Sequence, residues 1–277
     1  MRLHQTSIDS LRMELIVATT NAKAIDLLNL ISYNWKGEPI RIFADEALFQ
    51  SKRIKYVHGI VAATGQIGYA FYWDYQDDSS MVYFNKALKL AVKNQFEDLE
   101  SQFLNYIGDV NRIHYNHSEA LKYYYKALKI AKKRNDLARL SMLYCVIADV
   151  NRLQSNIDTA LVYYSKSLKL AIELRDLKRE AFCKAYIGDI FRVRLDYVNA
   201  IDCFKDAIAI ASKVDDKNLL CYCYMNCGSL YVNLFEPDSA LYNLKKSLEL
   251  ARQINDYGTQ LVSLGTLGSL YNDKKDF

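Results

Sequence analysis

The strongest constraint on the fold of this chain is a small residue that recurs at every fortieth position. Five glycines and one alanine occupy this slot, each inside an apolar segment: Gly68, Gly108, Ala148, Gly188, Gly228 and Gly268. Two further series of small residues keep the same period, namely Ser80, Ala120, Ala160, Ala200 and Ala240, then Ala87, Ala127, Ser167, Ala207 and Ser247. A fixed period of this length is typical of stacked supersecondary units and not of one globular core.

The apolar residues inside each unit follow helical spacing. Leu143, Ile147 and Val150 recur at three- and four-residue intervals in one segment, and Leu161 and Leu168 share a face in the next. The chain has only 2 prolines and 10 glycines among 277 residues, which favours long helices with short connections. We therefore predict an all-α fold, a solenoid of antiparallel helix pairs in which the small residues let the two helices approach closely.

The repeat frame divides the chain into an N-terminal capping helix over residues 1–20 and a helical array over residues 21–277. The first unit is degenerate, and we expect Pro39 in its turn. The last unit has a first helix only, so we expect the array to continue past Phe277 in a longer protein. The units are expected at about 21–60, 61–100, 101–140, 141–180, 181–220 and 221–260, with a half unit at 261–277. The apolar residues expected to stay uncovered in that half unit are Leu264, Leu267, Leu270 and Tyr271.

An aspartate recurs just before each of four first helices, at Asp136, Asp176, Asp216 and Asp256. A carboxylate at this position accepts an unpaired backbone N–H and interacts favourably with the positive end of the helix. We therefore predict that these residues are N-caps. One earlier unit has Phe96 in the same slot, so we expect its cap to shift to a neighbouring polar residue.

The order of glycine, aromatic and alanine positions, as in IGDIFRVRLDYVNAIDCFKDAIAIA, resembles the tetratricopeptide repeat over residues 21–277. The units are longer than the usual ~34 residues, and Asn111 and Asn151 replace the aromatic residue that follows the glycine elsewhere. HEAT-type repeats have a similar length but lack this pattern of small residues. The long units also resemble the sensor arrays of bacterial histidine kinases, nucleotide cyclases and transcription regulators. This resemblance implies a right-handed superhelix whose first helices line a peptide-binding groove.

The positions one and four residues after the small-residue slot face that groove, and three successive units carry an acid and an arginine there. The i, i+3 spacing places both side chains on one face of the helix. Two interpretations remain open: the pairs grip the backbone or the carboxylates of a peptide, or they form a salt-bridge ladder between units, which is the commoner arrangement. The residues are Asp109, Arg112, Asp149, Arg152, Asp189 and Arg192.

Aromatic residues occupy the same face and are candidate anchors for a ligand. Because the chain contains 22 tyrosines, packing between helices is an equally good interpretation. The candidate residues are Tyr69, Tyr72, Trp73, Tyr106, Tyr186 and Tyr222.

The remaining polar and thiol groups suggest no further chemistry. Lysines align on the second helices, but the net charge is only +4, which favours a solvated outer face and no nucleic-acid partner. The six cysteines are expected to be small buried hydrophobes. His114 and His117 lack a third metal ligand, and the chain contains no phosphate-binding loop and no motif of a catalytic site. We therefore expect neither a cofactor nor a metal, and no enzymatic activity.

The sequence favours a non-catalytic module that binds a protein or peptide, as the sensory or regulatory part of a larger signalling protein. The alternative is a passive assembly scaffold without a groove ligand. A homodimer through the uncapped C-terminal end is a possible further contact. The chain has no apolar run of membrane-spanning length, and we expect a cytoplasmic protein, or a periplasmic one if a signal segment precedes it.

Overall fold

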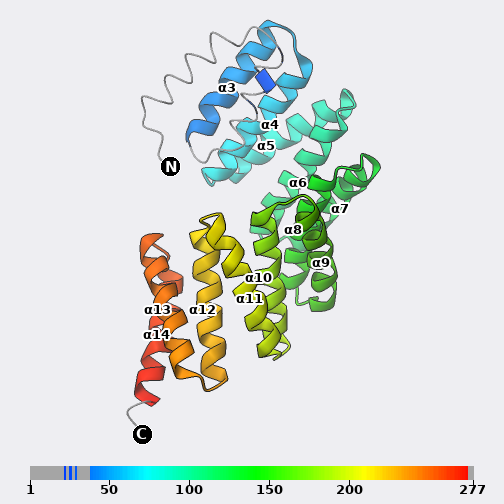
Figure 1. Ribbon diagram of the computed structural model, residues 1–277. Coiled ribbons are helices and arrows are strands. Elements are labelled where there is room, and N and C mark those ends of the chain that lie inside the picture. Colours follow the sequence, from blue (N-terminus) through cyan, green and yellow to red (C-terminus); the bar gives the residue numbers. More distant parts are fainter. Residues whose placement is uncertain (1–21, 23–24, 27–28, 30–37, 274–277) are drawn as a thin grey trace. The chain divides into compact units, whose positions relative to one another are not determined.

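The computed structural model describes residues 22, 25–26, 29 and 38–273, and every element in this part of the chain is an α-helix (Figure 1). The prediction of an all-α chain of helix pairs is confirmed, whereas the helix expected over residues 1–20 lies outside the described residues. The helices are α3 (Glu38–Arg53), α4 (Val57–Trp73), α5 (Asp77–Lys93), α6 (Glu97–Ile113), α7 (His117–Lys133), α8 (Leu137–Leu153), α9 (Ile157–Glu173), α10 (Leu177–Val193), α11 (Tyr197–Lys213), α12 (Lys217–Asn233), α13 (Pro237–Gln253) and α14 (Tyr257–Asp273).

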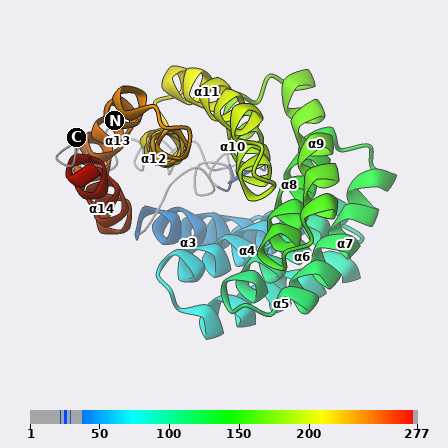
Figure 2. The same cartoon turned by 90° about the horizontal axis from the view of Figure 1, so that it is seen from below.

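The packing divides the chain into two compact units, residues 1–135 (unit 1) and residues 136–277 (unit 2). Within each unit, consecutive helices pack against one another, and α12, for example, contacts both α11 and α13 (Figure 2). The even-numbered helices from α4 onward carry the small-residue slot and are called first helices below. The odd-numbered ones are called second helices.

The helices are uniform in length because the period is uniform. From α4 to α14 each helix has 17 residues and is separated from the next by a three-residue turn. Each first helix from α4 onward begins four residues earlier than the unit boundary expected from the sequence, so that α4, for example, begins at Val57 and not at residue 61. Pro39 lies in the first turn of α3 and not in the turn before it, which corrects the expectation for this residue. Proline is tolerated there because the first N–H groups of a helix have no intrahelical acceptor.

The core of each hairpin is a large side chain of the second helix packed onto the small residue of the first. A Cβ added to Gly108 would lie 2.5 Å from the Tyr124 ring, and one added to Gly68 would lie 2.8 Å from Phe84. These distances are too short for any larger residue unless the ring moves. The side chains that occupy this position are all fully buried: Phe84, Tyr124, Tyr164, Phe204 and Leu244.

The four predicted aspartate caps are confirmed. Asp136 accepts a hydrogen bond from the backbone N–H of Arg139 at 2.9 Å, and the other three make the same bond. The cap expected to shift near Phe96 does not shift. Helix α6 begins at Glu97 with Phe96 at the N-cap position and without any side-chain cap. Three acidic residues in its first turn face the positive end of the helix instead.

The middle residue of each turn has a positive φ, between 52° and 62°. Its N–H and the next one bond back to the preceding helix, as when Glu236 N donates to Tyr231 O at 2.9 Å. In the turns within hairpins this position carries large apolar side chains that are exposed to solvent, and Phe235 is 91% exposed. The residues are Tyr75, Tyr115, Leu195 and Phe235, with Ser155 in the remaining hairpin.

The apolar face expected to stay uncovered on the last helix is partly covered. Leu267 packs with Leu244 and Leu248 of α13, and both Leu267 and Leu270 are buried. The prediction was wrong for these two residues because it assigned all four to one free face. It holds for Leu264 and Tyr271, which are about half exposed.

In unit 1 a histidine joins the starts of two first helices. His58 Nε2 lies 3.4 Å from Asp98 Oδ2, and His58 Nδ1 lies 3.4 Å from the Tyr56 hydroxyl, which donates to Asp26 at 3.0 Å. The hydrogen bond to Asp98 raises the pKa of His58, although partial burial acts in the opposite direction. The same bond lowers the pKa of Asp98 to about 2. The contact therefore favours a protonated imidazole beside an ionised carboxylate.

We predict that unit 1 is more stable at pH 5.5 than at pH 8. A raised folded pKa contributes stability below 6.5, the ordinary pKa of a histidine side chain, and this stability is lost as pH rises through the folded pKa. The lowered pKa of Asp98 contributes above 3.8 and is lost only as pH falls toward 2. Trp73 lies in α4 of unit 1 and the other tryptophan of the sequence is at position 35, before residue 136, so tryptophan fluorescence during urea unfolding reports on unit 1. His58→Asn should remove the difference, His117→Asn should keep it, and an unchanged difference in His58→Asn would contradict the assignment.

We predict that Phe204→Ala destabilises unit 2 by about 3–5 kcal/mol, because it leaves a cavity beneath the small-residue slot. Phe235→Ala makes the same chemical change at a side chain that is almost fully exposed, and should cost less than about 0.5 kcal/mol. Urea unfolding followed by circular dichroism measures both values. Equal losses for the two variants would show that the buried rings do not hold the hairpins together.

Candidate functional site

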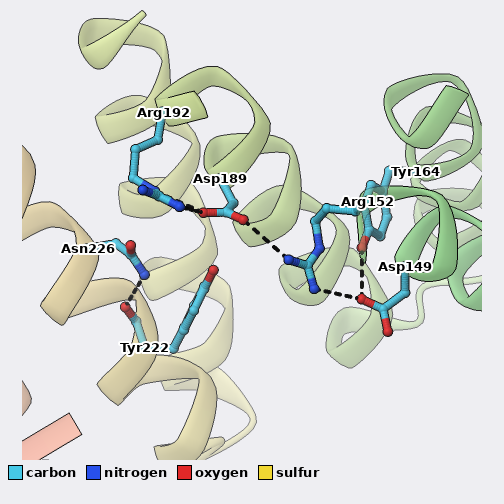
Figure 3. Close-up of polar contacts among 7 residues, drawn as sticks. All are labelled: Asp149, Arg152, Tyr164, Asp189, Arg192, Tyr222 and Asn226. Atoms are coloured by element: carbon cyan, nitrogen blue, oxygen red, sulfur yellow. Dashed lines mark hydrogen bonds and ion pairs between the residues drawn. The ribbon is translucent and has the colours of Figure 1, made fainter. Parts of the chain in front are cut away.

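Four charged residues of unit 2 form one continuous chain of ion pairs across α8 and α10 (Figure 3). Arg152 donates from Nη2 to Asp149 Oδ1 at 2.9 Å, and its Nη1 lies 3.6 Å from Asp189 Oδ2 on the next first helix. Arg192 donates to Asp189 Oδ1 from Nε at 2.9 Å and from Nη2 at 2.5 Å. Acid and base therefore alternate from Asp149 to Arg192.

Three members of this chain of ion pairs are largely buried, and Arg192 at its end is the most exposed. The side chain of Asp189, which serves two guanidinium groups, is only 6% exposed, and that of Arg152 is 23% exposed. The side chain of Arg192 is 41% exposed. Burial lowers the pKa of Arg152, but its hydrogen bond to Asp149 and the nearby Tyr164 outweigh this, and the net pKa is raised. The Arg152 guanidinium therefore stays charged at neutral pH.

A column of tyrosines accompanies the ion pairs. The Tyr186 ring is stacked on Tyr164 at 5.9 Å and on Tyr222 at 5.5 Å between ring centroids. The guanidinium carbon of Arg152 lies 4.8 Å above the Tyr186 ring, within the range of a cation–π interaction. Burial, and then the charge of Asp149, raises the pKa of Tyr186 to about 12, so its hydroxyl stays protonated. The tyrosines thus orient the arginine and add no charge.

The ion pairs stop at Arg192 within unit 2. The corresponding positions on α12 are Ser229 and Val232, which cannot continue the alternation. Among the ion pairs of the described residues, Arg192 has Asp189 as its carboxylate partner, and Nε and Nη2 both donate to it. A guanidinium has five N–H donors, so the outer side of Arg192 can donate to a second acceptor.

In unit 1 the candidate aromatic residues gather on α4 and α6. The Tyr69 ring is stacked on Tyr72 at 6.1 Å and on Tyr106 at 5.0 Å, and it meets the edge of Trp73 at 6.0 Å. Tyr106 also contacts Phe84 at 5.1 Å. This cluster and Asp109 line a cavity of about 10 Å³, which has room for no more than one water molecule. The rings therefore pack mainly on one another.

In unit 1, Asp109 and Arg112 make weaker contact with each other than the acid–arginine pairs of unit 2 do. Arg112 Nε lies 3.8 Å from Asp109 Oδ1, a long contact. The strong partner of Asp109 is the hydroxyl of Tyr124, which donates at 2.7 Å, and Asn105 donates to the second carboxylate oxygen at 3.1 Å. Burial and the charge of Asp109 raise the pKa of Tyr124, so the hydroxyl remains a donor.

The tyrosine hydroxyls beside the acids are the functional groups that reasoning from the sequence missed. Tyr124 and Tyr164 each lie 15 residues after an aspartate of the candidate site and donate to it, Tyr164 at 3.4 Å. The signal was available, because the two tyrosines and the two aspartates share the forty-residue period. These tyrosines pack on the small-residue slot and also contact the acids, so they connect the core to the candidate site.

The other groups considered in the sequence have ordinary surroundings. Five of the six cysteines are buried, Cys203 is half-buried, and all six are free thiols. Burial raises the pKa of Cys223, which makes it a weak nucleophile. His114 Nε2 pairs with Asp77 at 2.9 Å. The aligned lysines of the second helices are all exposed, namely Lys86, Lys89, Lys126, Lys129, Lys166, Lys169 and Lys246.

The comparisons agree with this architecture. A family model described as the tetratricopeptide repeat matches residues 180–253, which contain α10 to α13 apart from the first residues of α10. The predicted resemblance to this family is confirmed. No curated protein sequence matches the chain. None of the described helices has the length and apolar character needed to cross a membrane.

Solved structures with the same fold cover most of the chain. BtubC (BKLC) from P. vanneervenii aligns with a TM-score of 0.66 and 16% identity over 78% of this chain and 91% of its own. Aspartyl phosphate phosphatase F from Bacillus subtilis aligns with a TM-score of 0.65 and 15% identity over 100% of this chain and 75% of its own. A STAND signal-transduction ATPase with a tetratricopeptide repeat sensor, from Pyrococcus horikoshii, aligns with a TM-score of 0.64 and 17% identity. The alignment covers 94% of this chain and 37% of that protein. At these identities the likeness shows the fold alone.

We predict that Asp189→Asn destabilises α8 and α10 by roughly 2–4 kcal/mol, because two arginines lose their shared buried carboxylate. Asp158→Asn is the matched control, since it breaks a pair with Arg194 whose carboxylate is 94% exposed, and it should cost less than about 0.5 kcal/mol. Amide hydrogen exchange of the two helices measures the local loss. Equal protection in Asp189→Asn and the native chain would contradict the structural importance of this ion-pair chain.

Proposed function

We propose that this array of tetratricopeptide-type hairpins is a non-catalytic module that binds a protein or peptide on the face formed by its first helices. The tetratricopeptide fold is suited to interaction and regulation, since stacked hairpins present one continuous surface. The observation that carries the proposal is the exposed end of the ion-pair chain at Arg192. A ligand carboxylate bound there would add one further acid to the alternating series.

The surroundings of Arg192 suit an acidic group of a peptide. Its side chain is already oriented by two hydrogen bonds to Asp189, so little conformational entropy is lost when a ligand binds. Tyr222 and Asn226 of α12 lie on the side of Arg192 away from α8 (Figure 3). The ligand group is therefore an Asp or Glu side chain or a C-terminal carboxylate, held by a guanidinium whose planar fork matches carboxylate geometry.

The other predicted residues receive supporting roles in this proposal. Asp149, Arg152 and Asp189 hold Arg192 in place, and Tyr186 fixes the plane of Arg152. In unit 1, Tyr72 and the rest of the aromatic cluster offer ring faces to apolar side chains, with Asp109 and Arg112 as polar neighbours. Each unit thus contributes its own group of contacts.

We further propose that the module is the sensory or regulatory part of a larger signalling protein. The STAND protein from Pyrococcus horikoshii carries its tetratricopeptide repeats as a sensor, and this chain spans 37% of that protein. The six free thiols favour a reducing compartment, which supports a cytoplasmic location.

A passive assembly scaffold is the second candidate. The observation that favours it is the group of exposed apolar residues on α14, with Leu261 largely exposed and Leu264 and Tyr271 about half exposed. Such a group can join two copies of the chain. Sedimentation equilibrium distinguishes the two candidates: Leu261→Glu should abolish self-association if the scaffold is correct and should leave peptide binding unchanged if the recognition module is correct.

We predict that peptides selected from a random library on the native chain contain acidic residues or a free C-terminus, and that Arg192→Ala weakens their binding at least about tenfold. Arg194→Ala is the matched control, since its side chain is 39% exposed and also pairs with an aspartate, but in the turn after α10. Isothermal titration calorimetry should find the control within about twofold of the native chain. Equal affinity for Arg192→Ala and the native chain would contradict the proposed site.

A further inference from the structure

Unit 2 contains a second concave site, separate from the ion pairs, in a groove between α11 and α13. Its volume is about 570 Å³, within the range of ~300–1,000 Å³ found for ligand pockets. Tyr224 and Tyr231 of α12 line it together with Tyr242 and Asn243 of α13 and Lys205 of α11. None of the four charged residues of the ion-pair chain takes part.

The groove lies where a tyrosine of the repeat is replaced by a smaller residue. The position of Asn243 is occupied by Tyr83, Tyr123 and Tyr163 in three other hairpins and by Cys203 in the hairpin of α10 and α11. In the hairpins with tyrosine, this side chain covers an aromatic residue of the first helix, as when Tyr163 contacts Tyr144 at 5.9 Å. In the same way Tyr83 is stacked on Phe71 at 5.4 Å.

The two aromatic residues that are covered in those hairpins correspond to the two tyrosines of α12 that line the groove. Tyr144 lies two periods of 40 residues before Tyr224, and Phe71 lies four periods before Tyr231, so each pair shares one repeat position. Asn243 is too small to cover either ring, and its side-chain amide donates to Ser239 O at 2.8 Å within its own helix. Tyr224 and Tyr231 therefore both line the groove, and the Lys205 ammonium lies 5.8 Å from the centroid of the Tyr231 ring.

The spacing of these rings matches an extended proline-rich chain. Tyr224 and Tyr231 are seven residues apart on α12, which is two helical turns or about 10.5 Å. One turn of a polyproline II helix has 3 residues and rises about 9.3 Å. Prolines at positions i and i+3 of such a segment therefore meet one tyrosine ring each, which is the way in which aromatic grooves recognise proline-rich peptides.

The polar groups and the charge of the groove also suit this occupant. The residues that line it include one cation, Lys205, and one anion, Asp238, so their formal charges cancel. An uncharged segment fits this balance better than an acidic or basic one. Tyrosine hydroxyls and the Lys205 ammonium are donors, and the backbone carbonyls of a polyproline II helix, which makes no internal hydrogen bonds, are free acceptors.

We propose that the groove between α11 and α13 binds an uncharged, proline-rich segment of a partner protein in the polyproline II conformation. The site lies among residues that the acidic-peptide site does not use, so the two can be occupied independently. Asn243 determines specificity, because a tyrosine at this position would fill the groove.

The test is a titration of the full chain with a decaproline peptide that is acetylated, amidated and labelled with a fluorophore. Anisotropy should show saturable binding, and a Gly-Ser peptide of equal length, which has no preformed polyproline II structure, should bind at least about tenfold more weakly. Asn243→Tyr should weaken binding of decaproline at least about tenfold, because the new ring fills the groove as Tyr163 does in its own hairpin. Three hairpins already hold tyrosine at this position, so the variant is expected to fold, and circular dichroism checks it.

Tyr242→Ala is the second variant. Its ring is exposed and lies at the edge of the groove, so its removal should weaken decaproline binding at least about threefold without loss of helicity. The proposal is overturned if decaproline fails to saturate by about 2 mM, if the Gly-Ser peptide binds equally well, or if Asn243→Tyr binds as tightly as the native chain. Loss of binding in Arg192→Ala but not in Asn243→Tyr would also overturn it, by placing the peptide on the first-helix face. Failure of the acidic-peptide site alone would leave the decaproline result unchanged.

Discussion

The contact between a glycine or alanine of the first helix and a large buried side chain of the second is the interaction on which the rest of the structure depends. It brings the two helices of each hairpin close together and it repeats without change of position, as in Gly108 with Tyr124 and Gly228 with Leu244. Since the same residue pair recurs at a fixed interval, every hairpin adopts the same geometry. The surface side chains are therefore placed in regular rows by the core and not by contacts among themselves.

The tyrosines of this contact link the core to the candidate site. Tyr164 packs with its ring in the core while its hydroxyl donates to Asp149, the first residue of the ion-pair chain. In the three hairpins with Phe84, Phe204 and Leu244 the large side chain has no hydroxyl. The residue after the glycine is Tyr69 in the first, Asp189 with its arginine partners in the second, and Ser229 in the third. The chemistry of the first-helix face therefore varies with the side chain beneath it.

The fold was predictable from the sequence because its determinants are local and periodic. The small-residue slot and the aspartate caps are each read from single positions, and they are found where expected. The site was predictable only in part. The spacing of Asp149 and Arg152 predicts a shared face, but the bridge from Arg152 to Asp189 depends on how two helices pack. Leu267 was misplaced for the same reason, since α13 covers it. The groove beside Tyr231 was missed because one of the residues that line it, Asn243, departs from the repeat.

The uniform lengths of helix and turn have a consequence for how such a chain can change in length. Because each hairpin and its turns occupy one complete period, loss or duplication of 40 consecutive residues joins two equivalent points of the backbone. Both flanking helices then keep their phase, and each aspartate cap and each small residue meets a partner of the same kind. Insertions of other lengths would rotate the following helix away from its neighbour. The array can therefore gain or lose whole hairpins while every core contact is kept. A new arrangement of surface side chains can arise in this way without any substitution in the core.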